Sequence, residues 1–416
     1  KIMNQRLVEV LVIGAGPSGC VSAAFLQGQG IQVQVVEKSI FPRFVIGESL
    51  LPRCMDHFDE VGLLEGLNAF GFEKKFGARF IKGDKICEFD FSKKHTKGWD
   101  WTWQVPRADF DKVLVDELIK KGVEVSFGHE VVDVVIDENG GSLTTIKDEN
   151  GEPYQVQAKY IIDSSGYGRV LPRLLDLDKP SVLPSHSSIF THVVDVNRPE
   201  GRVGTLITFD VVDKEVWLWV IPFSNGRTSI GYVGPTEFLE SFEGSNGEKL
   251  TQMLKLSNYY YERFKGVEFL FEPVLIKNYS KSVKKLYGKG FVLTGNSAEF
   301  LDPVFSSGVT FATESALLGA KLIAKALKGE AVDWEKEYSD YIREGVNVFS
   351  SYVNEWYSGN LQTLFFHEPE NPEVKRQICS VLAGYVWDKT NPFVTKHNRL
   401  IRTVAHIIEL EKQKSE

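Results

Sequence analysis

The residues best suited to chemistry lie near the start of the sequence, where three glycines follow an apolar run. The run ends at Ile13 and is rich in β-branched residues, which is typical of a buried parallel strand. Gly14, Gly16 and Gly19 then have the spacing Gly-x-Gly-x-x-Gly. The first glycine permits a tight turn, the second lets backbone approach a pyrophosphate, and the third lets a helix pack closely on the strand. This spacing predicts a dinucleotide phosphate site.

The segments around the glycines are those of a strand–helix–strand crossover. Apolar spacing over residues 17–28 predicts a helix, and its N-terminus, with Pro17 and Ser18, presents free N–H groups and a positive dipole end. A second strand over residues 31–36 ends at Glu37, followed by Lys38. The Glu37 carboxylate can accept hydrogen bonds from ribose hydroxyls. The alternative is the same crossover with a glycine-rich turn and no ligand.

The next segments carry polar residues that could line the same site. Proline and glycine make residues 41–52 a shaped loop that contains Arg43, Glu48 and Ser49, and Arg107 leads into a predicted helix over residues 108–121. A helix is expected over residues 51–67. A plain connecting loop is the alternative interpretation of residues 41–52.

Two later strands end in residues typical of a cofactor site. The strand from Tyr160 ends in Asp163-Ser-Ser-Gly166, and the strand from Phe291 ends in Gly295-Asn296. A loop rich in small polar residues follows, and a helix is predicted over residues 309–327. The backbone N–H groups of Ser307 and Gly308 at its start form a candidate anion site.

The remaining periodicity predicts sheets and then helices. Four strands are expected over 124–127, 130–136, 143–148 and 154–158, as a β-meander inserted into the parallel fold. Residues 99–107 predict a strand with its three tryptophans on one face, and residues 181–285 a second lobe built on an antiparallel sheet. In that lobe, alternation over residues 216–222 places Trp217 and Trp219 together, either as core or as a pocket wall. The tail from residue 334 has helical spacing.

These elements define an α/β fold: a Rossmann-type unit with a β-meander insertion, an antiparallel-sheet substrate domain and a helical C-terminal region. The expected divisions are 1–80, 104–180 and 286–330 for the first unit, 81–103 and 181–285 for the second, and 331–416 for the third.

Composition narrows the classes of function. The net charge of −8 argues against a nucleic-acid partner. The four cysteines include no Cys-x-x-Cys pair, so neither a metal site nor a disulfide framework is expected, and a reducing cytoplasm fits. No apolar run reaches the ~18 residues that a membrane span needs.

The arrangement of the motifs favours a flavin over a nicotinamide. Enzymes that bind both nucleotides through separate Rossmann units carry two glycine fingerprints, and this sequence has one. A nucleotide half, a β insertion and a late Gly-Asn-Ser strand favour FAD, and the continuous βα series of simple NAD dehydrogenases is not found.

With these motifs the sequence resembles flavin-dependent halogenases, within the superfamily of aromatic hydroxylases and geranylgeranyl reductases. Gly14-x-Gly16-x-x-Gly19 with Glu37 matches the FAD fingerprint, and Asp163 to Gly166 resembles the second cofactor motif. Asn296 stands where the family usually has an aspartate that holds the ribityl chain. Trp217-x-Trp219-x-Ile221-Pro222 matches the halogenase signature that is thought to block hydroxylation.

The resemblance also implies roles for individual residues. Lys75, which the residues alone would place in a solvated turn beside Lys74, becomes the candidate catalytic lysine. The loop Asp302-Pro303-x-Phe305-Ser306-Ser307-Gly308 resembles the halide loop, in which backbone N–H groups hold chloride or bromide. Further residues are implied at the cofactor (Pro303, Gly308, Val309) and at the pocket wall (Trp217, Trp219, Pro222, Phe305).

The resemblance implies that a separate flavin reductase supplies reduced FAD, and that O2 and halide yield hypohalous acid, which Lys75 delivers to an electron-rich ring. Tryptophan halogenases carry a glutamate at the position of Phe305, so a phenol or pyrrole is expected, free or tethered to a carrier protein. Two alternatives stay open: a non-halogenating FAD monooxygenase or geranylgeranyl-reductase-like dehydrogenase, and a flavin-binding module without activity.

Overall fold

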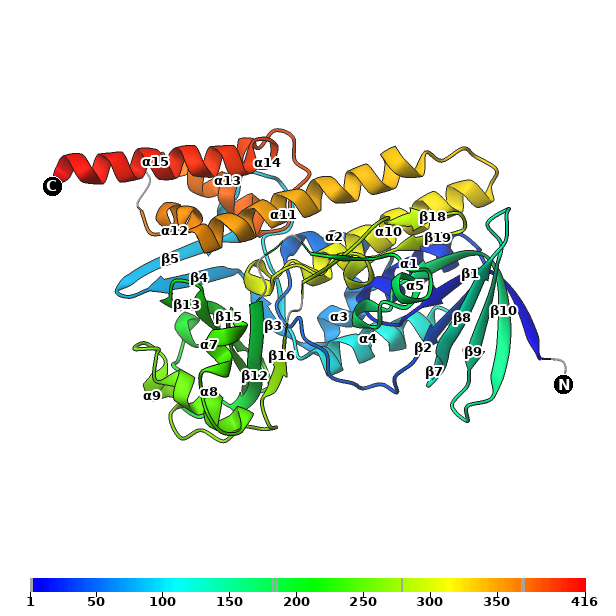
Figure 1. Ribbon diagram of the computed structural model, residues 1–416, viewed down its shortest axis with the longest axis horizontal. Coiled ribbons are helices and arrows are strands. Elements are labelled where there is room, and N and C mark those ends of the chain that lie inside the picture. The colour runs from blue at the N-terminus through cyan, green and yellow to red at the C-terminus, as the bar shows by residue number, and fades with distance from the viewer. Residues whose placement is uncertain (1–2, 182, 184–185, 278–279, 368–370) are drawn as a thin grey trace.

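The computed structural model describes residues 3–181, 183, 186–277, 280–367 and 371–416. Its first unit is an eight-stranded sheet with helices packed on it (Figure 1). The path through this sheet runs β18-β19-β10-β1-β2-β7, and β8 and β9 extend it beside β10. The strands are β1 (Gln5–Ile13), β2 (Val33–Glu37), β7 (Glu124–Phe127), β8 (Glu130–Ile136), β9 (Ser142–Lys147), β10 (Pro153–Asp163), β18 (Tyr287–Gly288) and β19 (Phe291–Leu293).

The central strands of this sheet are parallel and buried on both faces, as their apolar runs predict. Strand β1 pairs in parallel with β2 and β10, and β10 pairs in parallel with β19. Helix α1 (Pro17–Gly28) has the predicted bounds and packs against α10 (Gly308–Leu327). Helix α4 (Arg107–Lys120) also packs on α1. The carboxyl ends of these strands therefore meet the starts of α1 and α10 at one edge.

The β-meander is shorter than predicted. Strands β8, β9 and β10 are antiparallel neighbours, whereas β7 pairs in parallel with β2 at the sheet edge. The two strands expected over 154–158 and from Tyr160 are one strand, β10. Its sequence changes from alternating to continuous apolar because its first half pairs in the meander and its second half lies inside the parallel sheet.

The second unit is a seven-stranded sheet in the order β16-β12-β15-β14-β13-β4-β5. All its neighbours are antiparallel except β13 and β4, so the expectation of an antiparallel lobe is confirmed. The predicted boundary at residue 80 falls within β4. The strands are β4 (Gly77–Lys82), β5 (Lys85–Asp90), β12 (His186–Val194), β13 (Thr208–Asp213), β14 (Val216–Pro222), β15 (Arg227–Pro235) and β16 (Val274–Ile276).

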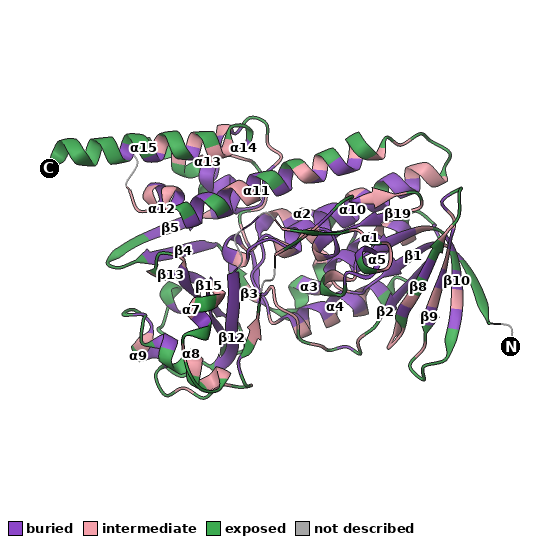
Figure 2. Cartoon of the chain, in the orientation of Figure 1, coloured by how far each residue is buried: buried purple, intermediate pink, exposed green. Residues whose placement is uncertain are grey.

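Alternation in β14 separates its side chains as predicted. Trp217 and Trp219 join the main core that continues into the first unit, while Leu218 and Val220 join a separate cluster on the opposite face of the sheet. Short helices cover that opposite face, and the central strands β12, β14 and β15 are buried along most of their length (Figure 2). These helices are α7 (Thr236–Glu240), α8 (Asn246–Leu254) and α9 (Tyr261–Phe264), whereas α6 (Arg202–Thr205) contributes no residue to that cluster.

Two predictions near residue 60 and residue 100 are wrong in extent. The helix expected over 51–67 is two helices, α2 (Pro52–Glu60) and α3 (Leu64–Phe70), because Gly62 between them adopts a φ of +73° that ends the first. The strand expected over 99–107 is only β6 (Thr102–Gln104), paired with β3 (Glu73–Lys75). The three tryptophans still contact one another in sequence through ring edges.

Short elements complete the connections. They are α5 (Val170–Leu174), the 3-10 turns η1 (Phe91–Lys93), η2 (Gly166–Gly168), η3 (Gly295–Ser297) and η4 (Pro303–Phe305), and the strand pair β11 (Asp178–Pro180) and β17 (Lys281–Val283).

The tail is helical, as predicted. Helix α11 passes from the first unit toward the antiparallel sheet, where Trp356 packs on Phe80 of β4 (Figure 1). The outermost helix, α15, keeps one side exposed (Figure 2). Within the described ranges, no helix is both long and apolar enough to cross a lipid bilayer. The elements are η5 (Glu335–Asp340), α11 (Tyr341–Ser358), α12 (Asn360–Phe365), α13 (Pro372–Leu382), α14 (Pro392–Thr395) and α15 (His397–Ser415).

Candidate functional site

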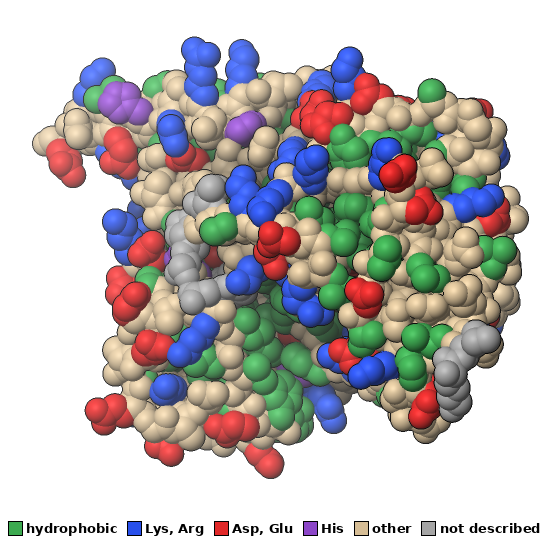
Figure 3. Space-filling view, turned by 45° about the vertical axis from the view of Figure 1, so that its right-hand side comes forward, with side chains coloured by type: hydrophobic (Ala, Val, Ile, Leu, Met, Phe, Trp, Pro, Cys, Tyr) green, Lys and Arg blue, Asp and Glu red, His purple; other side chains and the backbone are tan. Residues whose placement is uncertain are grey.

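A cavity of about 490 Å³ lies where the first unit meets the seven-stranded sheet. The face drawn in Figure 3 is hollowed near its middle, where hydrophobic side chains gather with charged side chains around them. The cavity lining brings together most of the predicted cofactor residues: Gly14, Gly16, Pro17, Ser18, Glu37, Lys38, Arg43, Glu48, Ser49, Arg107, Gly166, Asn296, Pro303, Gly308 and Val309. Segments more than 250 residues apart in sequence therefore share one site.

The glycine turn at the cavity has the predicted geometry. Gly14 adopts a φ of +102°, and a Cβ there would lie 2.2 Å from the Ser164 carbonyl oxygen. A Cβ on Gly19 would lie 1.9 Å from the Gly14 carbonyl oxygen, so this residue sets the approach of α1 to β1 and does not line the cavity. Gly16 lines the cavity at the start of α1. Its backbone offers the close approach that a pyrophosphate needs.

Glu37 at the end of β2 lies where a ribose acceptor is expected. Its Oε1 accepts from the Ala15 N–H at 3.0 Å, and its Oε2 accepts from the Ser39 N–H at 2.8 Å. These bonds fix the carboxylate across the glycine turn. Each oxygen keeps a further acceptor site for a ribose hydroxyl.

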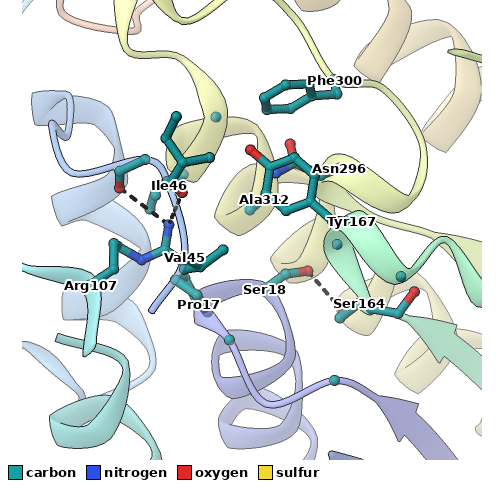
Figure 4. Close-up of a pocket in the computed structure, with 18 of the residues that line it drawn as sticks. Pro17, Ser18, Val45, Ile46, Arg107, Ser164, Tyr167, Asn296, Phe300 and Ala312 are labelled. Atoms are coloured by element: carbon teal, nitrogen blue, oxygen red, sulfur yellow. Dashed lines mark hydrogen bonds between the residues drawn. The ribbon is translucent and has the colours of Figure 1, made fainter. Parts of the chain in front are cut away.

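Three hydroxyls that the sequence analysis did not connect join the tips of the parallel strands. Ser18 Oγ lies 2.9 Å from Ser164 Oγ (Figure 4). Thr294 Oγ1 lies 2.6 Å from Ser18 Oγ and 2.8 Å from Ser164 Oγ. All three residues are buried and line the cavity. They come from α1 and from the ends of β10 and β19, so sequence spacing gave no signal for this contact.

Two cavity arginines share one carboxylate that sequence reasoning also missed. Arg43 Nη1 lies 2.5 Å from Asp111 Oδ2, and Arg107 donates from Nε and Nη2 to Asp111 at 2.8 and 3.1 Å. Arg107 Nη1 also donates to the carbonyls of Ile46 and Gly47, which holds the loop at the cavity (Figure 4). Asp111 is 1% exposed. The sequence signal that could have identified Asp111 as a partner of Arg107 is its position one helical turn later on α4.

Asp163 and Gly295 do not line the cavity, although a direct cofactor contact was predicted for both. The Asp163 carboxylate accepts from the backbone N–H groups of Ser165 at 2.9 Å and Leu171 at 2.8 Å, and burial raises its pKa. It therefore shapes the loop after β10 from inside the protein. Gly295, with a φ of +55°, lies close to Ala312 of α10. Asn296 projects toward the cavity beside Tyr167 (Figure 4).

The candidate catalytic lysine is buried directly behind the cavity lining. Lys75 is 1% exposed, and its Nζ donates to Ser49 Oγ and to the Leu50 carbonyl, both at 2.8 Å. Burial lowers the pKa of Lys75 to about 7. Ser49 lines the cavity, whereas Lys75 does not. Lys74 points the other way, with its Nζ 4.7 Å from the centre of the Trp101 ring.

Glu48, beside Ser49, has a partner from the second unit. Its Oε2 is in hydrogen-bond contact with Nε2 of His192, a residue of β12, and both side chains are buried. This contact ties the loop 41–52 to the antiparallel sheet. The contact partner is 144 residues away in sequence, so local spacing could not predict it.

The predicted halide loop lies at the start of α10. Pro303, Ser306 and Gly308 line the cavity, while Ser307 is buried behind them as the N-cap of the helix. Ser306 has a φ of +59°, a left-handed conformation that a non-glycine residue seldom adopts. The turn brings the N-terminus of a 20-residue helix to the cavity.

The predicted pocket wall is present in part. Trp217 and Trp219 line the cavity, and their indole N–H groups donate to Tyr357 and Ser229, each at 3.0 Å. Pro222 and Phe305 are not lining residues in the described part of the chain. Phe305 instead packs against α11, where the Trp356 ring lies 5.9 Å away. The sequence could not distinguish cavity from core for these two residues.

Comparisons with known proteins show which family and fold the chain shares. The family described as FAD binding domain matches residues 7–344. A chlorinase of 1H-pyrrole-2-carbonyl peptidyl-carrier protein from Pseudomonas fluorescens is 27% identical, over 92% of this chain and 91% of the relative.

Two solved structures share the whole fold. A flavoprotein/dehydrogenase from Cytophaga hutchinsonii has a TM-score of 0.96 and 51% identity, covering 98% of this chain and 100% of that one. The flavin-dependent brominase Bmp2 has a TM-score of 0.84 and 26% identity with the same coverage.

The residues present fit FAD: the glycine turn offers backbone N–H groups to a pyrophosphate, Glu37 offers acceptors to a ribose, and two arginines stand at the cavity. The chain belongs to the FAD binding domain family, as an FAD-dependent oxidoreductase whose relatives include the flavin-dependent halogenases.

Proposed function

We propose that this protein is a halogenase that uses reduced FAD, O2 and a halide to halogenate an electron-rich aromatic ring. The observation that carries the proposal is the position of Lys75. Its buried ammonium is hydrogen-bonded to the hydroxyl of Ser49, which lines the cavity. Ser49 therefore links the lysine to the cavity.

The environment of Lys75 suits the transfer of a halogen. Because burial lowers its pKa to about 7, the amine exchanges its proton near neutral pH. An ammonium is a compact donor that can hold hypohalous acid by a hydrogen bond, and the neutral amine can attack the halogen of that acid, so that an N–halogen bond forms, the O–halogen bond breaks and water leaves. Ser49 and the Leu50 carbonyl orient Nζ, so its position does not depend on a flexible stem.

The start of α10 supports a halide site. The backbone N–H groups of Ser307 and Gly308 belong to the first turn of the helix, where N–H groups lack intrahelical acceptors and the dipole favours an anion. Gly308 lines the cavity. Reduced FAD with O2 would supply the oxidising chemistry, and the chain would hold the halide beside it and exclude water.

The substrate is proposed to be a pyrrole or phenol, either free or tethered to a carrier protein. The relative from Pseudomonas fluorescens acts, by its name, on a pyrrole carried by a peptidyl-carrier protein. The proposal includes a separate flavin reductase as partner. The four cysteines are free and buried, which fits a reducing cytoplasm.

A second candidate function has support from one specific observation. The structure from Cytophaga hutchinsonii, 51% identical to this chain, is described as a flavoprotein/dehydrogenase. A non-halogenating FAD-dependent oxidoreductase would oxidise NAD(P)H directly, without a partner reductase. Consumption of NAD(P)H by the purified protein, with no halogenated product, would favour it.

The test supplies reduced FAD, O2 and bromide together with phenol and pyrrole substrates, and detects brominated product by mass spectrometry. We expect product from the wild type and from Lys74→Met, because Lys74 faces away from the cavity. Lys75→Met, which keeps most of the side-chain volume, should bind FAD and lose at least about 99% of the product. Equal product from both lysine variants would remove the proposed role of Lys75.

A further inference from the structure

The indole of Trp217 and the predicted halide loop both contact one hydroxyl, that of Tyr357 on helix α11. The Trp217 Nε1–H donates to the Tyr357 hydroxyl at 3.0 Å, and that hydroxyl donates to Asp302 Oδ2 at 2.7 Å. Asp302 opens the loop 302–308, and its Oδ1 accepts from the Val304 N–H at 3.0 Å. The three linked side chains are buried.

The geometry around Tyr357 holds its hydroxyl in one place. The His186 ring stacks on the phenol ring, with centroids 4.0 Å apart and planes 15° apart. His186 Nδ1 also lies 4.0 Å from Asp302 Oδ2. Burial, with the neighbouring Asp302, raises the pKa of Tyr357, so the hydroxyl keeps the proton that it donates to the carboxylate.

Helix α11 also contacts the loop 302–308 at Phe305. Phe305 packs by ring edges against Tyr352 and Trp356 of α11, at centroid distances of 6.3 and 5.9 Å. The loop is thus anchored twice on one helix, by the carboxylate of Asp302 and by the ring of Phe305. Ser306, in its left-handed conformation, and Gly308, which faces the cavity, follow directly after these anchors.

We propose that Tyr357 is a positioning residue that couples the cavity wall at Trp217 to the conformation of the loop 302–308, and so sets the affinity of that loop for halide. Removing the hydroxyl leaves the indole N–H without its acceptor and the carboxylate without one of its donors. Buried polar groups in this condition move toward other partners. The loop would then relax at the point that presents its N–H groups. This inference rests on the halide site proposed above.

The test measures bromide binding to the FAD-loaded protein at constant ionic strength, by the change in flavin absorbance and by the bromide-dependent rise in melting temperature. Tyr357→Phe keeps the ring and loses the hydroxyl, and we expect its bromide dissociation constant to rise about fivefold or more. Its FAD dissociation constant should change less. The matched control is Tyr352→Phe, because that hydroxyl lies on the same helix and donates to the Phe393 carbonyl instead.

Trp217→Phe removes the same link from its other end. We expect it to weaken bromide binding about twofold, and the double variant should bind bromide as Tyr357→Phe does, since one link is lost in both. If Tyr357→Phe failed to bind FAD, Trp217→Phe would decide: unchanged bromide binding overturns the coupling.

The outcomes separate this inference from the proposed function. A wild type that responds to bromide, with Tyr357→Phe and Tyr352→Phe both like it, overturns the role of Tyr357 and leaves the halide site standing. A wild type that gives no response beyond that to sodium acetate overturns the halide site, and the coupling with it.

Discussion

The Nζ atom of Lys75 lies 2.8 Å from Oγ of Ser49, and the serine lines the cavity while the lysine is 1% exposed. This hydroxyl stands between a buried amine and the cavity that we propose holds FAD. Ser49 forms a β-bridge with Gln104 of β6, and Lys75 lies in β3, so the relationship depends on the pairing of β3 with β6.

The burial of Lys75 predicts a specific dependence of stability on pH. Its pKa is about 7 in the folded protein and near 10.5 when unfolded, so between these values the unfolded chain binds more protons. The free energy of unfolding contributed by Lys75 therefore rises with pH across this window, and its cost is greatest below pH 7.

Denaturant unfolding of the wild type and Lys75→Met, from about pH 6 to about pH 9, measures this effect because their other titrations are shared. We expect the free energy of unfolding of the wild type to rise relative to that of Lys75→Met as pH rises, with a slope that approaches about 1.4 kcal/mol per pH unit. Lys74→Met is the control and should run parallel to the wild type. A pH-independent difference for Lys75→Met would mean that the amine is solvated.

Asp111 is expected to control FAD affinity without touching the cofactor. Asp111→Asn removes the charge shared by Arg43 and Arg107, and breaking such a buried pair costs about 3–5 kcal/mol. Both arginines line the cavity, so we expect the FAD dissociation constant to rise at least about tenfold, measured by flavin fluorescence. Asp116→Asn, which alters an exposed pair on the same helix, should bind FAD like the wild type. Equal affinities for the two variants would refute this role.

Gly14 is expected to be irreplaceable for steric reasons rather than for its φ alone. An alanine Cβ there would meet the Ser164 carbonyl at 2.2 Å, whereas Gly30, also at positive φ, has open space around it. We expect Gly30→Ala to cost about 1 kcal/mol of unfolding free energy and Gly14→Ala about 3 kcal/mol or more, with loss of FAD binding. Chemical denaturation of the two variants measures the difference, and equal costs would show that the collision is relieved.

Elements with strong local signals could be predicted from the sequence. Helix α1 and strand β14 have the predicted bounds, because α1 begins at a glycine turn and has a 3.6-residue apolar period, and β14 is a short apolar run that ends at a proline. Where two periodicities met in one segment, as in β10, the prediction was wrong. The break at Gly62 was missed because the apolar spacing on its two sides is similar.

The cavity lining follows the glycine motifs and strand tips, so most of it was predictable. The contacts that hold the lining residues in place were not predictable. Asp111, the Ser18–Ser164–Thr294 contact and the Tyr357 hydroxyl act across segments that only the tertiary fold brings together. Asp163 is the opposite case: its place at the end of a strand predicted a cofactor contact, but its carboxylate accepts from a backbone N–H group behind the cavity.

A halide at the start of α10 is central to the proposed function, and bromide is the probe that reveals it. Anomalous diffraction from crystals of the FAD complex soaked in bromide should show a peak within hydrogen-bond distance, roughly 3.5 Å, of the Ser307 or Gly308 backbone nitrogen. Soaks of Tyr352→Phe should give the same peak. Ordered bromide found only at the protein surface, with the FAD cavity free of anomalous density, would contradict the central claim.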